Sequence, residues 1–288
     1  MPLISTFYDH ILDISTQLSV SVAEALQEAR SLGISQLEVS FHNGDGHTQA
    51  LSRELSAAGM GISAIPAYFS FGRGADVSAQ AQPVFQLAKE LGADRLLVIP
   101  GFVQGRAKEA AAQAEAMLED VALLGELADK ASIRLTMEDY DNASAPYSTS
   151  AGMLRFLHAC PQLSACFDTG NFRFMAEDTL SAYGALRGRI GHVHLKDRAS
   201  APDYGDDELT ATDGAVLYPC PVGAGGMPIA QVLDMLRADG YQGTYTIEHY
   251  GARDMLSCLK ASVAWLAPRL GLGEQRLAGA ERPGVSST

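Results

Sequence analysis

Four short segments of the sequence each end an apolar run in a side chain that can bind a metal ion. The segments are T-M-E-D-Y-D-N, C-F-D-T-G-N-F, G-H-V-H-L-K-D and Y-T-I-E-H-Y-G, and the side chains are Glu138, Asp168, His194 and Glu248. The carboxyl ends of parallel strands in a barrel meet at one mouth, where residues distant in sequence can converge on one ion. The pattern therefore predicts a metal site built from three carboxylates and one imidazole.

Each of these residues also has a structural explanation. Burying a lone carboxylate is costly, so Glu138 and Glu248 are predicted ligands or catalytic groups, with a strand-end salt bridge as the alternative. Asp168 opens D-T-G-N and could instead form an Asx turn. His192 and His194 are two residues apart and share one face of a strand, so the strand period alone allows either to be the ligand.

The rest of the chain predicts strands that alternate with helices. The expected strands are Leu3 to Tyr8, Gln36 to Ser40, Gly61 to Ala67, Arg95 to Ile99, Arg134 to Glu138, Ala165 to Asp168, His192 to Leu195 and Thr244 to Glu248. Apolar residues at helical spacing predict helices at Val22 to Leu32, Val84 to Leu91, Ala107 to Ala131 and Ile229 to Ala238. No long linker interrupts this alternation, so we expect one (β/α)8 TIM barrel over residues 1–269.

Two segments depart from the alternation. Arg198 to Gly226 is long, acidic and rich in Gly, Pro and Asp, which predicts a loop after the seventh strand that overhangs the barrel mouth as a lid. Residues 270–288 are Gly-rich, polar and without period, which predicts a loosely held C-terminal tail.

The composition restricts the class of protein. A net charge of -13 opposes binding to phosphate backbones, so we expect no nucleic-acid partner. No apolar run approaches the roughly 18 residues that a membrane span needs, and the N-terminus lacks the features of a signal peptide. The four cysteines have no C-x-x-C spacing and are expected to be buried thiols. These features predict a cytoplasmic protein with no membrane association.

The order E, D-T-G-N, H-V-H-L-K-D, I-E-H-Y resembles the xylose isomerase-like barrel superfamily of sugar phosphate isomerases and epimerases, over nearly the whole chain. The resemblance implies a metal site of Glu138, Asp168, His194 and Glu248, and thus His194 rather than His192. P-V-G-A-G-G-M-P at residues 221–228 also resembles a segment that follows the seventh strand in the family. Asn171 is a departure, because tagatose-epimerase-like relatives carry a His there, and Asn does not titrate near neutral pH.

The resemblance implies proton abstraction next to a carbonyl. The donor set suits Mn2+, with Mg2+, Zn2+ or Co2+ as alternatives. Such an ion would act as a Lewis acid that stabilises an enediolate. Glu138 and Glu248 would remove and return the proton, which gives epimerisation or aldose–ketose isomerisation.

Further residues are expected to line the mouth. The predicted substrate-binding side chains are Lys196, Asn171, His10, His42, Tyr68 and Arg198, and Glu38 and Tyr250 occupy similar strand-end positions. For Lys196, pairing with Asp197 or another carboxylate is the structural alternative.

Two other functions stay open. The same superfamily includes dehydratases of keto-cyclitols and of dehydroshikimate, in which the enolate expels a β-hydroxyl group. A non-catalytic barrel that binds a sugar is the second alternative. The expected partner is a small carbohydrate or keto-cyclitol, and the family resemblance implies a possible homo-oligomer.

Overall fold

The computed structural model describes residues 2–272. Eight parallel strands form a closed barrel, in the order β1 (Leu3–Phe7), β2 (Gln36–Glu38), β3 (Gly61–Tyr68), β4 (Arg95–Ile99), β5 (Arg134–Glu138), β6 (Leu163–Asp168), β7 (Ile190–Ala199) and β10 (Thr244–Glu248). The barrel closes because β10 pairs with both β7 and β1. The predicted TIM barrel is confirmed.

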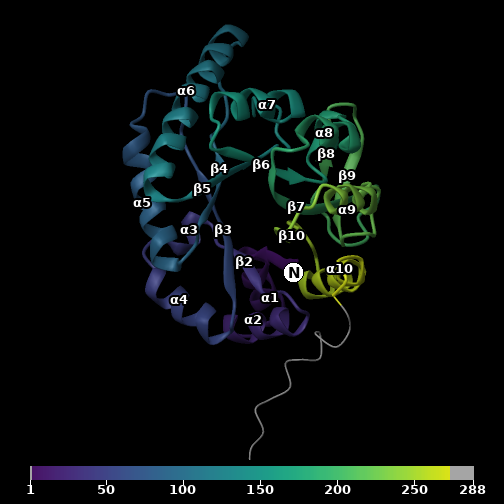
Figure 1. Ribbon diagram of the computed structural model, residues 1–288. Coiled ribbons are helices and arrows are strands. Elements are labelled where there is room, and N and C mark those ends of the chain that lie inside the picture. Colours follow the sequence, from purple (N-terminus) through teal and green to yellow (C-terminus); the bar gives the residue numbers. More distant parts are fainter. Residues whose placement is uncertain (1, 273–288) are drawn as a thin grey trace, which may run out of the picture.

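Helices surround the barrel on all sides, as Figure 1 shows in a view along its axis. They are α1 (Tyr8–Leu18), α2 (Val22–Ser31), α3 (Phe41–Gly44), α4 (Thr48–Ala57), α5 (Val77–Leu91), α6 (Ala107–Ala131), α7 (Ser150–Ala159), α8 (Thr179–Leu186), α9 (Ile229–Ala238) and α10 (Met255–Arg269), with a 3-10 turn at Phe172–Met175. The helices cover the outer face of the strands and barrel side chains fill the inner face, which explains buried apolar runs such as Leu96 to Ile99.

The local sequence sets most element ends. Ser21 and Glu24 form a capping box at the start of α2, and Asp76 caps α5 by accepting from the N–H groups of Ser78 and Ala79. The prediction that this helix begins at Val84 is wrong, because the Asp76 cap starts it at Val77 and Pro83 is accommodated inside it.

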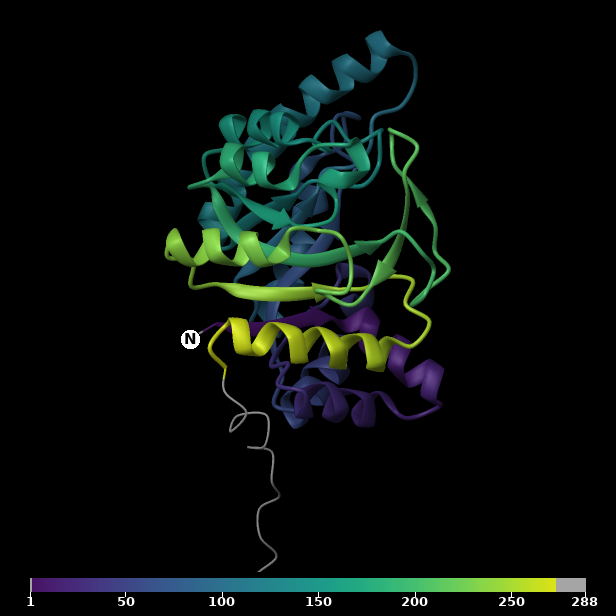
Figure 2. The same cartoon turned by 90° about the vertical axis from the view of Figure 1, so that its right-hand side faces the viewer.

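The segment after β7 is more ordered than the predicted loop. β7 continues to Ala199, and β9 (Val216–Cys220) pairs antiparallel with it, while β8 (Leu209–Thr210) pairs with β9. Figure 2 shows this extension, in green, beyond the carboxyl ends of the barrel strands. The long segment predicted after the seventh strand, residues 198–226, is therefore present and includes a small antiparallel extension of the barrel sheet.

The segment at residues 221–228 is held to the end of β7 by one carboxylate. Asp197 Oδ2 accepts from the N–H groups of Gly223 and Gly225 at 2.9 and 3.0 Å, and Oδ1 accepts from Met227 at 3.0 Å. Gly223 has φ +88° and packs so closely on Trp265 that a Cβ would lie 2.4 Å from the ring. This glycine-rich turn thus anchors the extension at the barrel mouth.

The predicted tail at residues 270–288 lies mostly outside the described residues. Of its described part, Leu270 and Leu272 pack against the core. Within residues 2–272, none of the helices has both the length and the apolar composition for crossing a bilayer.

Candidate metal centre and substrate cavity

The four predicted ligands converge at the carboxyl end of the barrel. Glu138, Asp168 and Glu248 are the last residues of β5, β6 and β10, and His194 lies opposite Asp168 in the register of β6 and β7. One donor atom from each of the four lies within 4.8 Å of the others, and all four residues are buried. Parallel strands end at the same rim, which is why segments more than a hundred residues apart meet here.

His194 Nδ1 is at the centre of the group. It lies 2.9 Å from Glu138 Oε2 and 3.3 Å from Glu248 Oε2. Asp168 Oδ1 accepts from the N–H groups of Gly170 and Asn171, both at 2.7 Å, so the predicted Asx-type turn is present as well. The other oxygen, Oδ2, is buried and has no hydrogen-bond partner among the described residues. A buried acceptor without a donor fits a position that a cation satisfies.

The electrostatics also favour a cation. Burial raises the pKa of Asp168 to about 7, although Lys196 opposes the shift. Burial likewise raises the pKa of Glu138, with His194 opposing. Burial alone would raise the pKa of Glu248 too, but Lys196 and His194 lower it below its usual range. Three carboxylates brought this close repel one another, and a divalent cation among them would relieve that repulsion.

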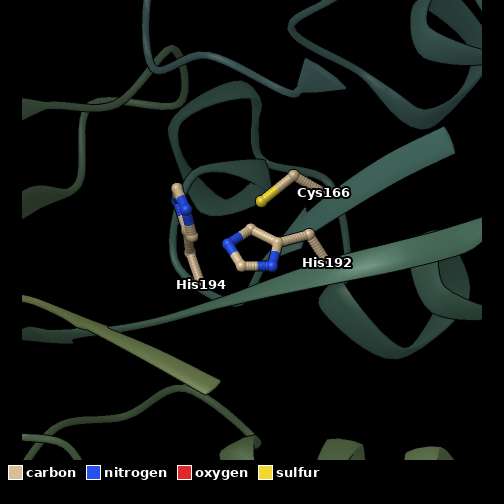
Figure 3. Close-up of side chains that lie close together, drawn as sticks. All are labelled: Cys166, His192 and His194. Carbon is tan, nitrogen blue, oxygen red and sulfur yellow. The ribbon is translucent and has the colours of Figure 1, made fainter. Parts of the chain in front are cut away.

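We call the four predicted ligands, Glu138, Asp168, His194 and Glu248, the ligand layer. A second layer of polar side chains lies beneath it inside the barrel. Glu38 Oε1 lies 2.7 Å from His192 Nε2, 2.9 Å from His194 Nε2 and 2.7 Å from Thr246 Oγ1. Cys166 on β6 completes this layer, and Figure 3 shows its sulfur pointing toward the two imidazoles. We call Glu38, Cys166, His192 and Thr246 the lower layer.

The lower layer decides between the two histidines. A neutral imidazole has one N–H and one lone pair. Because His194 Nε2 faces the acceptor Glu38, its Nδ1 is left with the lone pair, which points into the space between the carboxylates where a cation would lie. His192 lies one layer deeper and contacts Glu38 and Thr246 instead. Cys166, His192 and His194 also lie close enough for shared ligation, but His194 has only one lone pair available.

Lys196 and Asn171 lie directly beside the ligand layer. Lys196 Nζ lies 2.5 Å from Glu248 Oε1 and donates to Asn171 Oδ1 at 2.8 Å, and Asn171 Nδ2 donates to the backbone oxygen of Asp139 at 2.9 Å. Burial alone would lower the pKa of Lys196, but Asp141 and Glu248 raise it above its usual range. Lys196 therefore pairs with these carboxylates rather than with Asp197.

The outer predicted residues fall into two groups. His42, Tyr68 and Arg198 line the cavity, and Tyr68 shares a 2.7 Å hydrogen bond with Tyr140. His10 does not line it, because its ring is fully buried and its Nε2 accepts from the N–H of His249 at 2.9 Å. Glu38 is likewise buried in the lower layer rather than at the mouth, whereas Tyr250 lines the cavity.

The ligand layer opens into a cavity of about 720 Å³, which is large enough for a monosaccharide-sized molecule. Its wall includes acidic and aromatic residues that the sequence did not single out, namely Asp9, Phe41, Tyr140, Asp141, Asp207 and Glu208. Asp141 lies three residues after Glu138 in E-D-Y-D-N, and the several acidic residues in this short segment could have indicated that it lines the cavity. Asp207 and Glu208 lie in the acidic segment 198–226 that was predicted to overhang the mouth, whereas no sequence pattern indicated Asp9.

Comparisons with known proteins agree with this architecture. The family model described as xylose isomerase-like TIM barrel matches residues 26–269, so the chain belongs to that family. No curated protein matches the sequence significantly.

Three solved structures illustrate the structural similarity. L-ribulose 3-epimerase has 20% identity and a TM-score of 0.71, over 97% of both chains. The probable 3-DHS dehydratase AsbF of Bacillus anthracis has 17% identity and a TM-score of 0.70, over 93% of this chain and 99% of that one. A xylose isomerase-like TIM barrel protein from Mycobacterium smegmatis, in complex with magnesium, has 20% identity and a TM-score of 0.65, over 87% of this chain and 89% of that one. At these identities the similarity shows the fold.

Proposed function

We propose that this protein is a divalent-metal-dependent isomerase or epimerase of a sugar or sugar phosphate, acting by proton abstraction next to a carbonyl. The observation that carries the proposal is the position of Glu138 and Glu248. They come from strands on different sides of β6 and β7, both line the cavity, and both approach the same nitrogen of His194. Such a pair can remove a proton from a substrate carbon and return one to it or to its neighbour.

Glu138, Asp168, His194 and Glu248 would hold the ion. The donor set fits, because it supplies three hard oxygen ligands and one imidazole, with one buried Asp168 oxygen unpartnered among the described residues. We favour Mn2+, with Mg2+, Zn2+ or Co2+ as alternatives, since oxygen-rich sites discriminate weakly among these ions. When bound, a divalent ion supplies Lewis-acid polarisation of a carbonyl.

The protein groups around the ion would orient the substrate. Lys196 is held by Glu248 and Asn171, so its ammonium is positioned to donate to a substrate oxygen as negative charge develops during enediolate formation. Asn171 can hold a substrate hydroxyl but cannot exchange a proton with it near neutral pH. The aromatic side chains of Phe7, Tyr68 and Tyr250 line the cavity and would exclude water from the reacting carbon.

Dehydration is the second candidate reaction. The fold is similar to that of a probable 3-DHS dehydratase, and Asn171 stands where tagatose-epimerase-like relatives carry a titratable His. The same carboxylate pair could form an enolate that expels a β-hydroxyl group instead of being reprotonated. A cytoplasmic location and a homo-oligomeric state remain predictions.

The test is proton exchange with solvent. The Mn2+-loaded protein is incubated in D2O with ketoses, their phosphates, hydroxypyruvate, keto-cyclitols and dehydroshikimate, and the products are followed by NMR. We expect deuterium at the carbon next to the carbonyl, lost in Glu248→Gln. Loss of water with a new ultraviolet-absorbing conjugated carbonyl would identify the dehydratase. Absence of both, with the metal bound, would favour the non-catalytic barrel.

A further inference from the structure

The charged residues at the cavity divide into an inner set with both signs of charge and an acidic rim. The inner carboxylates are Glu138, Glu248 and Asp141, which line the cavity, and Asp168, which is buried beside Glu138 and Glu248. The positive charges among them are Lys196, Arg198 and the proposed divalent ion. Lys196 Nζ lies 2.5 Å from Glu248 and 3.6 Å from Asp141, and Arg198 lies 2.6 Å from Asp141. Both cations of the inner cavity are therefore already paired with carboxylates.

The acidic rim consists of Asp9, Asp207 and Glu208, which line the same cavity. Their polar partners are neutral groups. Asp9 Oδ1 accepts from Asn43 Nδ2 at 2.9 Å, and Glu208 Oε2 accepts from Tyr218 OH at 3.1 Å. Within residues 2–272, no basic nitrogen lies within 4.0 Å of the three carboxylates. The rim thus adds negative charge to the cavity that is not paired with a basic side chain of residues 2–272.

The position of Asp207 and Glu208 is fixed by the segment between β7 and β8. Arg253 donates from its backbone to Tyr204 O at 2.8 Å, and its guanidinium pairs with Asp206 at 2.6 Å. Gly205 lies so close to Gly251 that a Cβ would be 2.2 Å from its carbonyl oxygen. This segment lies on the extension beyond the carboxyl ends of the strands, where Figure 2 shows it over the mouth.

We propose that the acidic rim makes this site select uncharged polyhydroxy carbonyl compounds over phosphorylated or carboxylated ones. The inference rests on the proposed function for one point, namely that the bound compound carries a carbonyl group that reacts. A phosphate group on a substrate would enter a cavity in which Lys196 and Arg198 are occupied and the rim is negative. Like charges in a partly enclosed site repel, whereas hydroxyl groups of an uncharged sugar can donate to the rim carboxylates. The rim therefore acts as a specificity determinant against anions.

The experiment measures binding rather than turnover. Dihydroxyacetone, dihydroxyacetone phosphate and inorganic phosphate are titrated into the Mn2+-loaded protein, and binding near the ion is read from paramagnetic broadening of their NMR signals. The test variant is Asp207→Asn with Glu208→Gln. We expect the variant to strengthen binding of both phosphates by about 5- to 30-fold at low salt, with less effect at high salt. Binding of dihydroxyacetone should change less than about 2-fold.

The matched control is Asp203→Asn with Asp213→Asn, which changes the net charge by the same amount in the same segment. Neither residue lines the cavity, and neither takes part in the Arg253 contacts that position Asp207 and Glu208. This control should leave phosphate binding unchanged. Preference of the unaltered protein for the phosphate ester, or equal phosphate binding by test and control variants, would overturn the proposal. Selectivity without deuterium exchange would instead count against the proposed function alone.

Discussion

Two polar layers inside the barrel hold carboxylate and imidazole side chains in different proportions. In the lower layer, a single Glu38 oxygen meets His192, His194 and Thr246. In the ligand layer above it, Glu138 and Glu248 share one imidazole nitrogen, Glu248 also pairs with the Lys196 ammonium group, and Asp168 Oδ2 has no partner among the described residues. Three protein groups can donate to Glu38 Oε1 in the lower layer, whereas carboxylate oxygens outnumber donors in the upper layer. The upper layer therefore fits a cation, and the lower layer holds His194 Nε2.

The largest expected effect is the loss of a ligand from the upper layer. Asp168→Asn keeps an oxygen that accepts from Gly170 and Asn171, so the turn should persist, but it removes one negative charge. A bound ion supplies several kcal/mol of transition-state stabilisation, so we expect deuterium exchange to fall by on the order of 10³-fold. Mn2+ titration by electron paramagnetic resonance should show weaker binding, with an unchanged circular dichroism spectrum. Unaltered Mn2+ affinity would remove Asp168 from the ligand set.

The next effect tests the orienting role of the lower layer. Glu38→Gln removes the charge that faces His194 Nε2 without altering any proposed ligand. Loss of such a partner typically lowers metal affinity by about 10- to 100-fold, because the imidazole is no longer held in one tautomer and orientation. Mn2+ titration checks the change, with Glu54→Gln as control because Glu54 accepts from Tyr8 away from the site. A purely structural role for Glu38 predicts equal affinity in both variants.

His10 extends the comparison to an imidazole outside both layers. Burial lowers the pKa of His10 to about 3, so the folded state keeps it neutral while the unfolded chain takes up a proton below about pH 6.5. The His10 contribution therefore leaves stability unaffected above pH 6.5 and lowers it as the pH falls from there toward 3, by up to about 1.4 kcal/mol per pH unit. His10→Gln removes this dependence.

Urea unfolding with a chelator at pH 7.5 and pH 5 measures the effect for both proteins. Between pH 7.5 and pH 5, the free energy of unfolding of the unaltered protein should fall by about 2 kcal/mol more than that of His10→Gln. Parallel dependence on pH in the two proteins would show that His10 is not a buried neutral imidazole.

The smallest effect concerns the sulfur of the lower layer. Cys166 is fully buried and behaves as a small apolar side chain, so Cys166→Ala should cost about 1 kcal/mol of stability. Metal affinity should stay within about 2-fold, as it should in Cys160→Ala, a matched buried cysteine at the end of α7. A drop in affinity comparable to that of Asp168→Asn would place the ion in the lower layer.

The sequence by itself determined the barrel and the strand ends that carry the proposed ligands. Buried parallel strands read as short apolar runs, and several ends were predicted to the residue, as for Arg134–Glu138 and Thr244–Glu248. The length of α5 was missed because its start depends on the Asp76 cap rather than on apolar spacing. The apolar runs and strand ends depend on consecutive residues, which is why they can be predicted from the sequence.

Only the tertiary structure decided which polar residues face one another. The strand period gives His192 and His194 the same face, and the contact with Glu38 on β2 shows that His194 presents Nδ1 to the carboxylates. The burial of His10 against His249 and the placement of Asp207 at the cavity follow from contacts across the barrel. Such contacts depend on closure of the sheet and on the path of the segment after β7, neither of which is encoded in any short stretch of sequence.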